Sequence, residues 1–389
     1  MSSLNATVRL HDRSEMKHLV FVNSGHAHLT ALVKMKKYRN LGHTVTVVSP
    51  SAYQYYSGMG PGMLSGIYRP QDIRFNIKKM TEDRGGLFVE DRVVRVDPSQ
   101  KCLMLGSGKT ISYDIVSFNT GSDVPSGSLD ITSENVYTVK PIINLMNARI
   151  RIEEAVRHKT LRIVVVGGGP AAVEIAGNVW RLLKERGGRA DITIAAGSRL
   201  LKGLPDRVRS LAADSFRKRG ITIVEGRHVS ALENDRVVCD DGSSLMHDIA
   251  FIATGVRASS LFRESGLPVG QDGGLLVNRH LQSVRYPEIF GGGDCISMDS
   301  HQLAKVGVYA VRENMILYQN LMATLEGGEL MTFSPQKHYM LILNMGDGRG
   351  IIWKKEFIWH GRLAFALKDY IDRKFMRTFQ VSGERGSTG

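Results

Sequence analysis

The residues of this sequence with the clearest chemical spacing form a turn of small residues near its middle. Gly167, Gly169 and Ala172 follow the apolar run Leu161–Val166 in the order G-x-G-x-x-A. In such a turn the first glycine makes a tight bend, the second lets the backbone approach a pyrophosphate, and the small third residue allows helix and strand to pack closely. The N-terminus of the following helix then faces the phosphates. The spacing therefore predicts a dinucleotide-binding site.

A second turn of the same kind lies near the N-terminus but departs from the pattern. After the strand predicted at 18–22, the three positions hold Asn23, Gly25 and His28. Asparagine tolerates left-handed backbone better than other non-glycine residues, so the bend is feasible. His28, however, is bulky for a position where helix and strand pack. Taken alone, the turn is compatible with a working site and with a unit that has lost its ligand.

The elements that position these turns repeat along the chain. Each turn joins a strand, a helix and a second strand, which is the βαβ unit that binds a dinucleotide. The two units are predicted at 18–22, 29–41 and 44–48, and at 161–166, 173–186 and 191–196. Two later strands end at matching places in the two halves with the pairs Thr120-Gly121 and Thr254-Gly255. We therefore predict an α/β fold with two Rossmann-like domains in tandem, three-stranded antiparallel inserts such as 92–96 and 236–239, and a C-terminal α+β tail.

Composition and charge narrow the environment in which the protein works. The 389 residues carry a formal net charge of +13, which favours nucleic acid or an anionic membrane as a partner. Because no nucleic-acid-binding motif is present, a membrane surface is expected. Three widely spaced cysteines indicate a reducing compartment. Without a long apolar run or a signal peptide, we expect a cytoplasmic protein, peripheral on the inner face of the membrane where it binds lipid. The histidines show no ligand spacing, so no metal site is expected.

A third run of small residues, Ile289–Cys295, ends a predicted strand with glycines and Asp294. With this run, the order of motifs resembles that of the pyridine nucleotide-disulfide oxidoreductase superfamily over about residues 17–330. Tyr56–Leu64 stands where disulfide reductases carry a cysteine pair, and its lack of cysteine excludes disulfide reduction there. This run is similar instead to the type II NADH dehydrogenase-like branch, and most to the flavoprotein module associated with selenide, water dikinases. Gly25–His28 and the stretches 305–312 and 359–379 carry the same resemblance.

The resemblance implies a domain order and two cofactors. We expect a disordered extension at 1–15, an FAD-binding domain at 16–122 and 286–330, a connection at 123–160, an NAD(P)-binding domain at 161–285, and a C-terminal interface or membrane domain at 331–389. FAD is expected at Asn23, Ser24, Gly25, His26, Ala27, Ser49, Pro50, Gly58, Thr120, Gly121, Gly293, Asp294, Lys305 and Val306. NAD(P) is expected at Gly167, Gly169, Pro170, Ala171, Glu174, Ser198, Arg199, Thr254 and Gly255.

The electron donor is expected to be NADPH or NADH, because Glu174 matches a glutamate that lies near nicotinamide and flavin in type II NADH dehydrogenases. A carboxylate in the first turn of a helix also interacts well with the helix dipole, so a simple helix-start charge is the alternative. The next strand ends without the acid that usually holds the ribose 2′-hydroxyl, and Arg199 suits a 2′-phosphate. NADPH, NADH and no nicotinamide use all stay open. Ser49 likewise replaces an acid at the FAD ribose, where its hydroxyl bonds more weakly.

The electron acceptor is expected to be a quinone or a similar molecule. Lys305 precedes an apolar helix predicted at 306–325, whose start the resemblance places near the flavin pyrimidine, where a lysine stabilises negative charge on reduced flavin. Lys305 and Tyr309 are the candidate quinone residues, the alternative being a lysine paired with a local carboxylate. We therefore expect an FAD-dependent NAD(P)H dehydrogenase with Glu174 and Lys305 as catalytic residues. A sulfide:quinone oxidoreductase that uses Cys295 and a non-enzymatic flavoprotein sensor or assembly partner are the alternatives.

The stretch 362–379 has the pattern of a basic amphipathic helix. Its apolar stripe consists of Leu363, Leu367, Ile371, Phe375 and Phe379, and off that stripe lie Arg362, Lys368, Arg373 and Arg377. Such a helix binds an anionic membrane surface, packs on the protein's own core, or joins a second subunit in a homodimer. Quinones are lipid-soluble, so membrane contact fits the expected chemistry.

Overall fold

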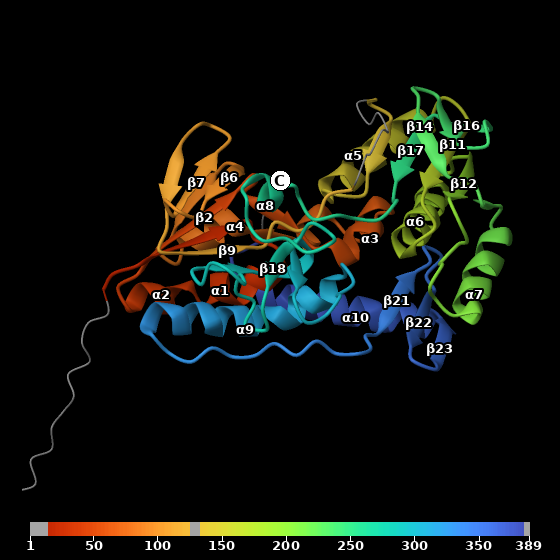
Figure 1. The fold of residues 1–389 in the computed structure, drawn as a ribbon. Coiled ribbons are helices and arrows are strands. Elements are labelled where there is room, and N and C mark those ends of the chain that lie inside the picture. Colours follow the sequence, from red (N-terminus) through yellow and green to blue (C-terminus); the bar gives the residue numbers. More distant parts are fainter. Residues whose placement is uncertain (1–14, 125–132, 385–389) are drawn as a thin grey trace, which may run out of the picture.

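The computed structural model describes residues 15–124 and 133–384 and places the two predicted units side by side (Figure 1). Each unit is built on a five-stranded parallel sheet, with the strand orders β19-β9-β1-β2-β5 and β10-β17-β11-β12-β13. The predicted α/β class is confirmed. Residues 1–14 of the predicted extension lie outside the described residues. The first sheet contains β1 His18–Val22, β2 Thr44–Ser49, β5 Leu87–Glu90, β9 Ile115–Phe118 and β19 Ile289–Gly291. The second contains β10 Val136–Thr138, β11 Leu161–Val166, β12 Ala190–Ala196, β13 Thr222–Glu225 and β17 Ile249–Ile252.

The strands are apolar on both faces because helices cover both sides of a parallel sheet. In β9 and β17 every residue is buried, and in β11 only Arg162 is exposed. Two edge strands come from outside the main segment of their unit. β19 pairs with β9, so a strand that follows the second unit closes the edge of the first sheet. β10 pairs with β17, so the interval 123–160 contributes an edge strand to the second sheet as well as connecting the units.

The helices differ from the sequence prediction mainly at their ends. The single helix predicted at 29–41 is two helices, α1 Leu29–Val33 and α2 Met35–Asn40, separated at Lys34. α6 Pro170–Arg186 begins with a proline, whose fixed φ suits the first helical position, and ends at the left-handed Gly187. α9 Gly307–Glu326 matches the helix predicted at 306–325. The other helices of the two units are α3 Gly60–Leu64, α4 Ile77–Glu82, α5 Ile143–Ala155, α7 Asp206–Arg217 and α8 Leu261–Glu264.

The smaller sheets lie at the edges of the two units. The predicted inserts are antiparallel sheets of three strands, β6 Val93–Asp97, β7 Cys102–Leu105 and β8 Thr110–Ser112, and β14 Val229–Leu232, β15 Arg236–Cys239 and β16 Ser244–Met246. Two-stranded pairs are formed by β3 Tyr53–Tyr55 with β4 Arg74–Asn76 and by β18 Leu275–Val277 with β20 Ile296–Met298. Short 3₁₀ turns occur at His26–His28, Ser57–Met59, Pro70–Asp72 and Gly293–Cys295.

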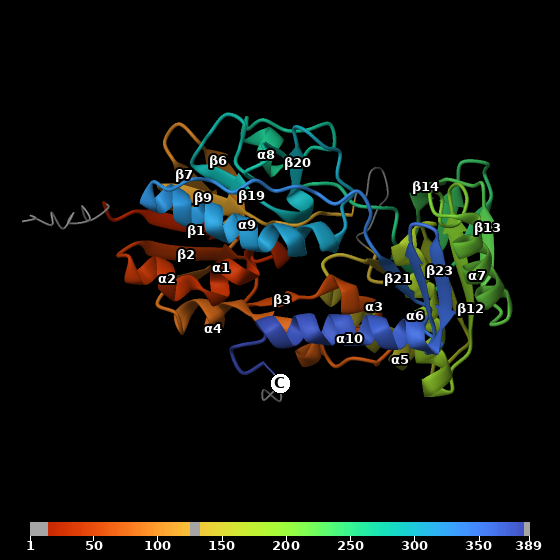
Figure 2. The same ribbon diagram turned by 90° about the horizontal axis from the view of Figure 1, so that it is seen from below.

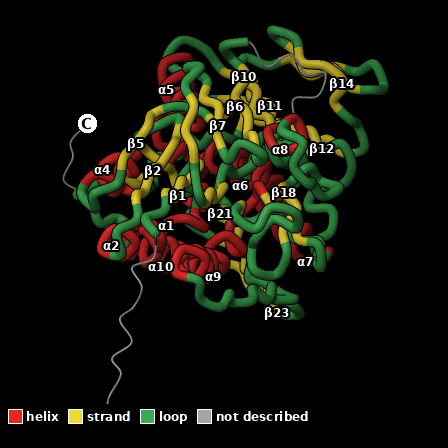
Figure 3. Tube along the Cα trace, turned by 60° about the vertical axis from the view of Figure 1, so that its left-hand side comes forward, coloured by secondary structure: helices red, strands yellow, loops and turns green. Residues whose placement is uncertain are grey.

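The C-terminal tail ties the two units together. Its sheet consists of β21 Leu341–Asn344, β22 Gly350–Lys354 and β23 Phe357–Gly361, and α10 Arg362–Phe379 follows at once. The sheet packs against α6 and α7 of the second unit, and α10 runs from there to the first unit (Figure 2). Helices α2, α9 and α10 gather on the side away from β6 and β7 (Figure 3). No helix among the described residues is both long enough and apolar enough to cross a membrane.

Candidate functional site

One cavity of about 1220 Å³ opens between the two units. It exceeds the 300–1,000 Å³ usual for a site that holds one small molecule. It is lined by most of the predicted FAD residues, Asn23, Gly25, His26, Ser49, Pro50, Thr120, Gly121, Gly293, Asp294, Lys305 and Val306. Most of the predicted NAD(P) residues line it too, namely Gly167, Gly169, Pro170, Ala171, Glu174, Ser198, Thr254 and Gly255. Both glycine turns therefore face the same space.

Five predicted residues do not line the cavity. Ser24 and Ala27 are fully buried behind the first turn. Gly58 lies beside the cavity, where its carbonyl accepts a hydrogen bond from Lys368. Arg199 lies outside the lining and forms an ion pair with Asp206. Tyr309 lies in the core, and its hydroxyl donates to the carbonyl of Gln336 at 3.3 Å.

The degenerate first turn is well formed, and His28 supports it. Asn23 has φ 63°, the left-handed backbone expected for it. A Cβ on Gly25 would overlap the Asn119 side chain, so this position requires glycine. The buried His28 ring is 2.8 Å from the Asn23 carbonyl through Nδ1 and 2.8 Å from Ser117 Oγ through Nε2. Burial lowers the pKa of His28 to about 4, so the ring stays neutral. The bulky side chain therefore holds strand and turn together.

The second turn leaves room for a phosphate. Gly167 has φ 130°, and a Cβ there would overlap the Ala253 carbonyl. A Cβ on Gly169 would meet nothing within 4 Å, so the backbone at this position is open to the cavity. α6 begins immediately afterwards at Pro170, so its free N–H groups and positive dipole end face the space where an anion would lie.

Asp294 is held in its charged form by residues that the sequence did not reveal. Its Oδ2 accepts hydrogen bonds from Lys140 Nζ at 2.8 Å and from Ser122 Oγ at 2.8 Å. Burial opposes ionisation, but Lys140 and Ser122 outweigh it and keep the pKa of Asp294 below its usual value. Lys140 comes from the interval 123–160, which carried only the prediction of a connection. No spacing in the sequence relates it to Asp294.

Glu313 is a second carboxyl group behind the same turn. Its Oε2 accepts a hydrogen bond from the backbone N–H of Gly293 at 2.5 Å, and its side chain is fully enclosed. Burial raises the pKa of Glu313 to about 7, and the charge of Asp294 adds to the effect. An acid on the inward face of the apolar helix α9 was the only signal that could have indicated this residue from the sequence.

Lys305 lines the cavity and also has a local partner. Its Nζ lies 2.8 Å from Asp272 Oδ2 and 2.5 Å from the carbonyl oxygen of Ile296. Asp272 also contacts the hydroxyl of Ser297. Lys305 is therefore paired with a local carboxylate, which was the alternative to a role at the flavin. It still lines the cavity together with Asp294.

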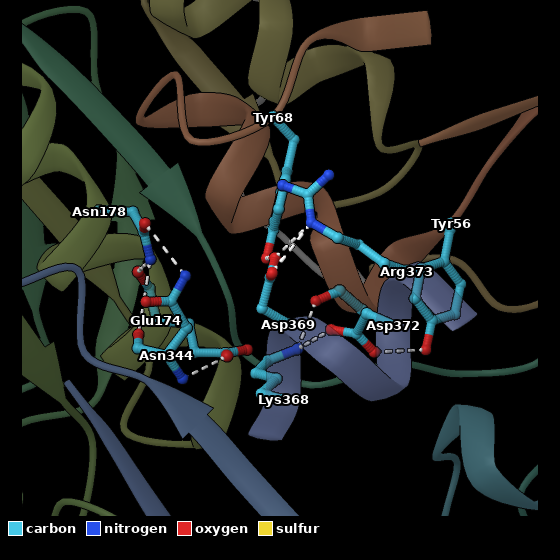
Figure 4. A network of polar contacts seen from close by, with 10 residues as sticks. Tyr56, Tyr68, Glu174, Asn178, Asn344, Lys368, Asp369, Asp372 and Arg373 are labelled. Atoms are coloured by element: carbon cyan, nitrogen blue, oxygen red, sulfur yellow. Dashed lines mark hydrogen bonds and ion pairs between the residues drawn. The ribbon is translucent and has the colours of Figure 1, made fainter. Parts of the chain in front are cut away.

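Glu174 belongs to a buried polar network that reaches α10 (Figure 4). Its Oε1 accepts a hydrogen bond from the Asn344 backbone N–H at 2.7 Å. Burial raises the pKa of Glu174, although the nearby charge of Lys368 reduces the effect. Lys368 Nζ donates to Asp372 Oδ2 and to the Gly58 carbonyl, each at 2.7 Å. One lysine of the tail therefore bonds to the loop of the first unit and acts through its charge on the carboxyl group of the second.

The inward face of α10 carries charged as well as apolar residues. The residues buried on this helix are Ala364, Lys368, Asp372 and Met376. Lys368 therefore lies off the apolar stripe, as predicted, but on the side that packs against the protein. The predicted apolar stripe divides. Leu363, Leu367 and Ile371 point outward, with 66%, 38% and 38% of their surfaces exposed. Phe375 turns inward to the rings of His26 and Tyr56. Lys368 can be buried among these residues because it pairs with Asp372 and with the Gly58 carbonyl.

The buried groups that face the cavity fit a flavin dinucleotide. His26 lines the cavity, burial lowers its pKa to about 4, and its Nε2 has no hydrogen-bond partner among the described residues. A buried polar atom without a partner is costly, and a bound polar ligand would satisfy it. No group of three metal-ligating side chains occurs in the described part of the chain.

Comparison with known proteins agrees with this arrangement. The chain is 28% identical over 283 residues to ferroptosis suppressor protein 1 of Taeniopygia guttata, covering 69% of this chain and 71% of the relative. It is 24% identical over 189 residues to the type II NADH:quinone oxidoreductase of Haemophilus influenzae, covering 42% and 43%. The solved structure of NDH2 from Plasmodium falciparum in complex with NADH has a TM-score of 0.80 at 14% identity, covering 95% and 98%.

The sulfide:quinone oxidoreductase of Aquifex aeolicus has a TM-score of 0.76 at 18% identity, covering 94% of this chain and 92% of that one. At these identities the two solved structures show the fold. The family model described as pyridine nucleotide-disulphide oxidoreductase matches residues 17–313, which is most of the chain. The protein belongs to the pyridine nucleotide-disulphide oxidoreductase family.

Proposed function

We propose that this protein is an FAD-dependent oxidoreductase that passes electrons from NAD(P)H through flavin to a quinone or a similar acceptor. The observation that carries this proposal is the single cavity lined by both glycine turns, by Glu174 and by Lys305. One cavity that holds two dinucleotides lets their reacting rings meet. The names of the relatives, a type II NADH:quinone oxidoreductase among them, support the same chemistry. A closer relation to the flavoprotein module associated with selenide, water dikinases is a proposal that rests on Tyr56–Leu64.

FAD would supply the redox chemistry, accepting a hydride and passing electrons on. The chain's own residues bind and orient it. Asn23, Gly25 and His26 of the first turn would face the pyrophosphate, and Ser49 and Pro50 would lie at the ribose end. Asp294, kept charged by Lys140, would accept hydrogen bonds from ribityl hydroxyls. Thr120, Gly121 and Val306 complete the proposed binding surface, and Gly58 supports it from behind through its contact with Lys368.

Glu174 is the proposed carboxyl group at the nicotinamide. Because burial raises its pKa, it holds a proton more readily than an exposed glutamate does. It can therefore accept a hydrogen bond from, or donate one to, a ring placed beside α6. Lys368 lies close enough to oppose full neutralisation, so the protonation state of Glu174 responds to a change in nearby charge.

Lys305 is the proposed cation at the flavin edge where the acceptor is reduced. It lines the cavity at the start of α9, so its charge and the helix N-terminus both stabilise an anion there. Tyr309 is one turn further along the helix, with its hydroxyl bonded to Gln336. We therefore assign Tyr309 to packing beneath the acceptor site, and Lys305 alone to contact with the acceptor.

The outer face of α10 is the proposed membrane contact. Leu363, Leu367, Tyr370 and Ile371 are exposed on one side of the helix, and Arg362, Lys374 and Arg377 are exposed beside them. An exposed apolar stripe with flanking cations binds the boundary of an anionic bilayer. A site reached from such a surface suits a lipid-soluble acceptor. A homodimer through the same face is the competing arrangement.

Vesicle sedimentation tests the membrane contact. The double variant Leu363→Ser and Leu367→Ser is expected to lose most binding to vesicles that contain phosphatidylglycerol, while wild type binds them better than phosphatidylcholine alone. Leu87→Ser is the matched control, because Leu87 is 60% exposed on β5. Equal binding by wild type and the double variant would contradict the proposal. A dimer in ultracentrifugation that the double variant converts to monomer would assign the face to a second subunit.

Anaerobic titration of the flavin absorbance tests the reaction. Rapid bleaching by NADPH or NADH, followed by reoxidation with a soluble quinone, is the expected result. Glu174→Gln should slow bleaching by either nucleotide while leaving FAD bound. Bleaching by sulfide alone would contradict the proposal and favour sulfide oxidation, for which buried Cys295 would need a partner. A yellow protein that no donor reduces would indicate a non-enzymatic flavoprotein.

A further inference from the structure

The adenosine end of the second unit lacks the residues that normally read a ribose. In a dinucleotide fold the 2′ position lies beyond the second strand, where an acid or an arginine contacts it. Here β12 ends at Ala196, and Gly197 and Ser198 line the cavity just beyond it. Neither carries a charge, so the specificity of this end must come from another segment.

The charged residues nearest the strand end are already engaged. Arg199 forms an ion pair with Asp206 and does not line the cavity. Glu225, the last residue of β13, accepts hydrogen bonds from the Leu200 backbone N–H at 2.7 Å and from Arg209 at 2.8 Å. Through these contacts Glu225 fixes the loop after β12.

His228 occupies the remaining side of this end of the cavity. It lies between β13 and β14 and lines the cavity together with Gly197 and Ser198. Its ring rests on Gly197, because a Cβ there would come within 2.6 Å of His228 Nδ1. Its backbone is fixed to Asp240, with its N–H 3.1 Å from Oδ1 and its carbonyl accepting from the Asp240 N–H at 2.8 Å.

We propose that His228, with Ser198, reads the ribose 2′ position of the nicotinamide dinucleotide and favours the 2′-phosphate of NADPH. An imidazole N–H and a hydroxyl are hydrogen-bond donors to a phosphate oxygen. No carboxylate lines the cavity beside them to repel a phosphate: the lining residues there are Gly197, Ser198, His228 and Val229. This inference rests on the proposed function, since it names the residue that selects the donor of that reaction.

The test is binding of dinucleotide fragments that cannot react. Calorimetry with ADP-ribose and 2′-phospho-ADP-ribose, on the full chain with FAD bound, measures the adenosine end apart from hydride transfer. Wild type is expected to bind the phosphorylated fragment more tightly. His228→Ala should weaken that fragment by about tenfold, the loss of one hydrogen bond to a charged group, and ADP-ribose by less than about twofold. His158→Ala, also an exposed histidine, is the matched control.

His228→Asp supplies a second, independent readout. A carboxylate at this place repels the phosphate and accepts the ribose hydroxyl, so the preference should change to ADP-ribose. Equal losses for both fragments in His228→Ala, or no loss for either, would overturn the assignment. The proposed function can fail separately. If the fragments bind as expected but neither NADPH nor NADH reduces the flavin, the assignment of the adenosine site stands and the proposed reaction is refuted. A wild type that binds neither fragment would overturn both.

Discussion

Replacing Lys368 with methionine tests whether α10 completes the site. The Lys368 side chain is 11% exposed. Its ammonium group donates to Asp372 Oδ2 at 2.7 Å (Figure 4) and to the Gly58 carbonyl at 2.7 Å. Lys368→Met keeps most of the side-chain volume but leaves Asp372 buried with one hydrogen bond, from Tyr56 at 2.9 Å. Removing one partner of a buried ion pair costs about 3–5 kcal/mol, because the other charge is left uncompensated.

The assay is urea unfolding of the FAD-bound protein. Unfolding is monitored by tryptophan fluorescence and by the release of flavin. We expect the midpoint to fall for Lys368→Met and to recover in part when Asp372→Leu is added, since the double change removes both charges. Lys374→Met is the control, because Lys374 is exposed on the same helix. A cost below about 1 kcal/mol for Lys368→Met, equal to that of the control, would refute the reasoning that this buried pair holds the tail in place.

Three further outcomes follow from other contacts. The pKa of Glu313 rises from 4.5 to about 7 on folding, so the folded state binds the extra proton. The free energy of unfolding therefore falls by roughly 3 kcal/mol as pH rises from 4.5 to about 7. Glu313→Gln should flatten this part of the profile of stability against pH, and an unchanged slope would contradict the prediction. Gly177→Ala places a Cβ against the Met345 carbonyl and should cost about 1–3 kcal/mol in a thermal melt. Asp294→Asn removes a charged acceptor and should raise the FAD dissociation constant about tenfold, measured by flavin fluorescence on dilution.

Periodicity and turn chemistry predicted the two units because those signals are local. β11 and α10 match their predicted bounds, and both glycine turns formed where their spacing placed them. The prediction of one helix at 29–41 was wrong only because the helix breaks at Lys34. The residues around Lys34 give no signal for that break. Asp294 and Glu174 were indicated by the family resemblance, and both line the cavity.

The partners of those residues could not be predicted, because they come from distant segments. Lys140 reaches Asp294 across 154 positions, and Lys368 reaches the Gly58 carbonyl across 310. The apolar stripe of α10 left open whether the helix binds a membrane, the core or a second subunit. The groups that surround buried Lys368, namely Asp372, the Gly58 carbonyl and Glu174, carry no signal in that pattern. The hydrophobic pattern placed Lys368 off the stripe but gave no sign that it is buried.

The position of Lys368 also has a consequence for biosynthesis. A ribosome makes both dinucleotide units before it reaches α10, so each sheet can form while Glu174 still lacks the neighbouring cation. Glu174 and the Gly58 loop gain that common partner only when the tail has emerged and docked. A nascent chain therefore forms both glycine turns before Lys368 is in place beside Glu174 and the Gly58 loop.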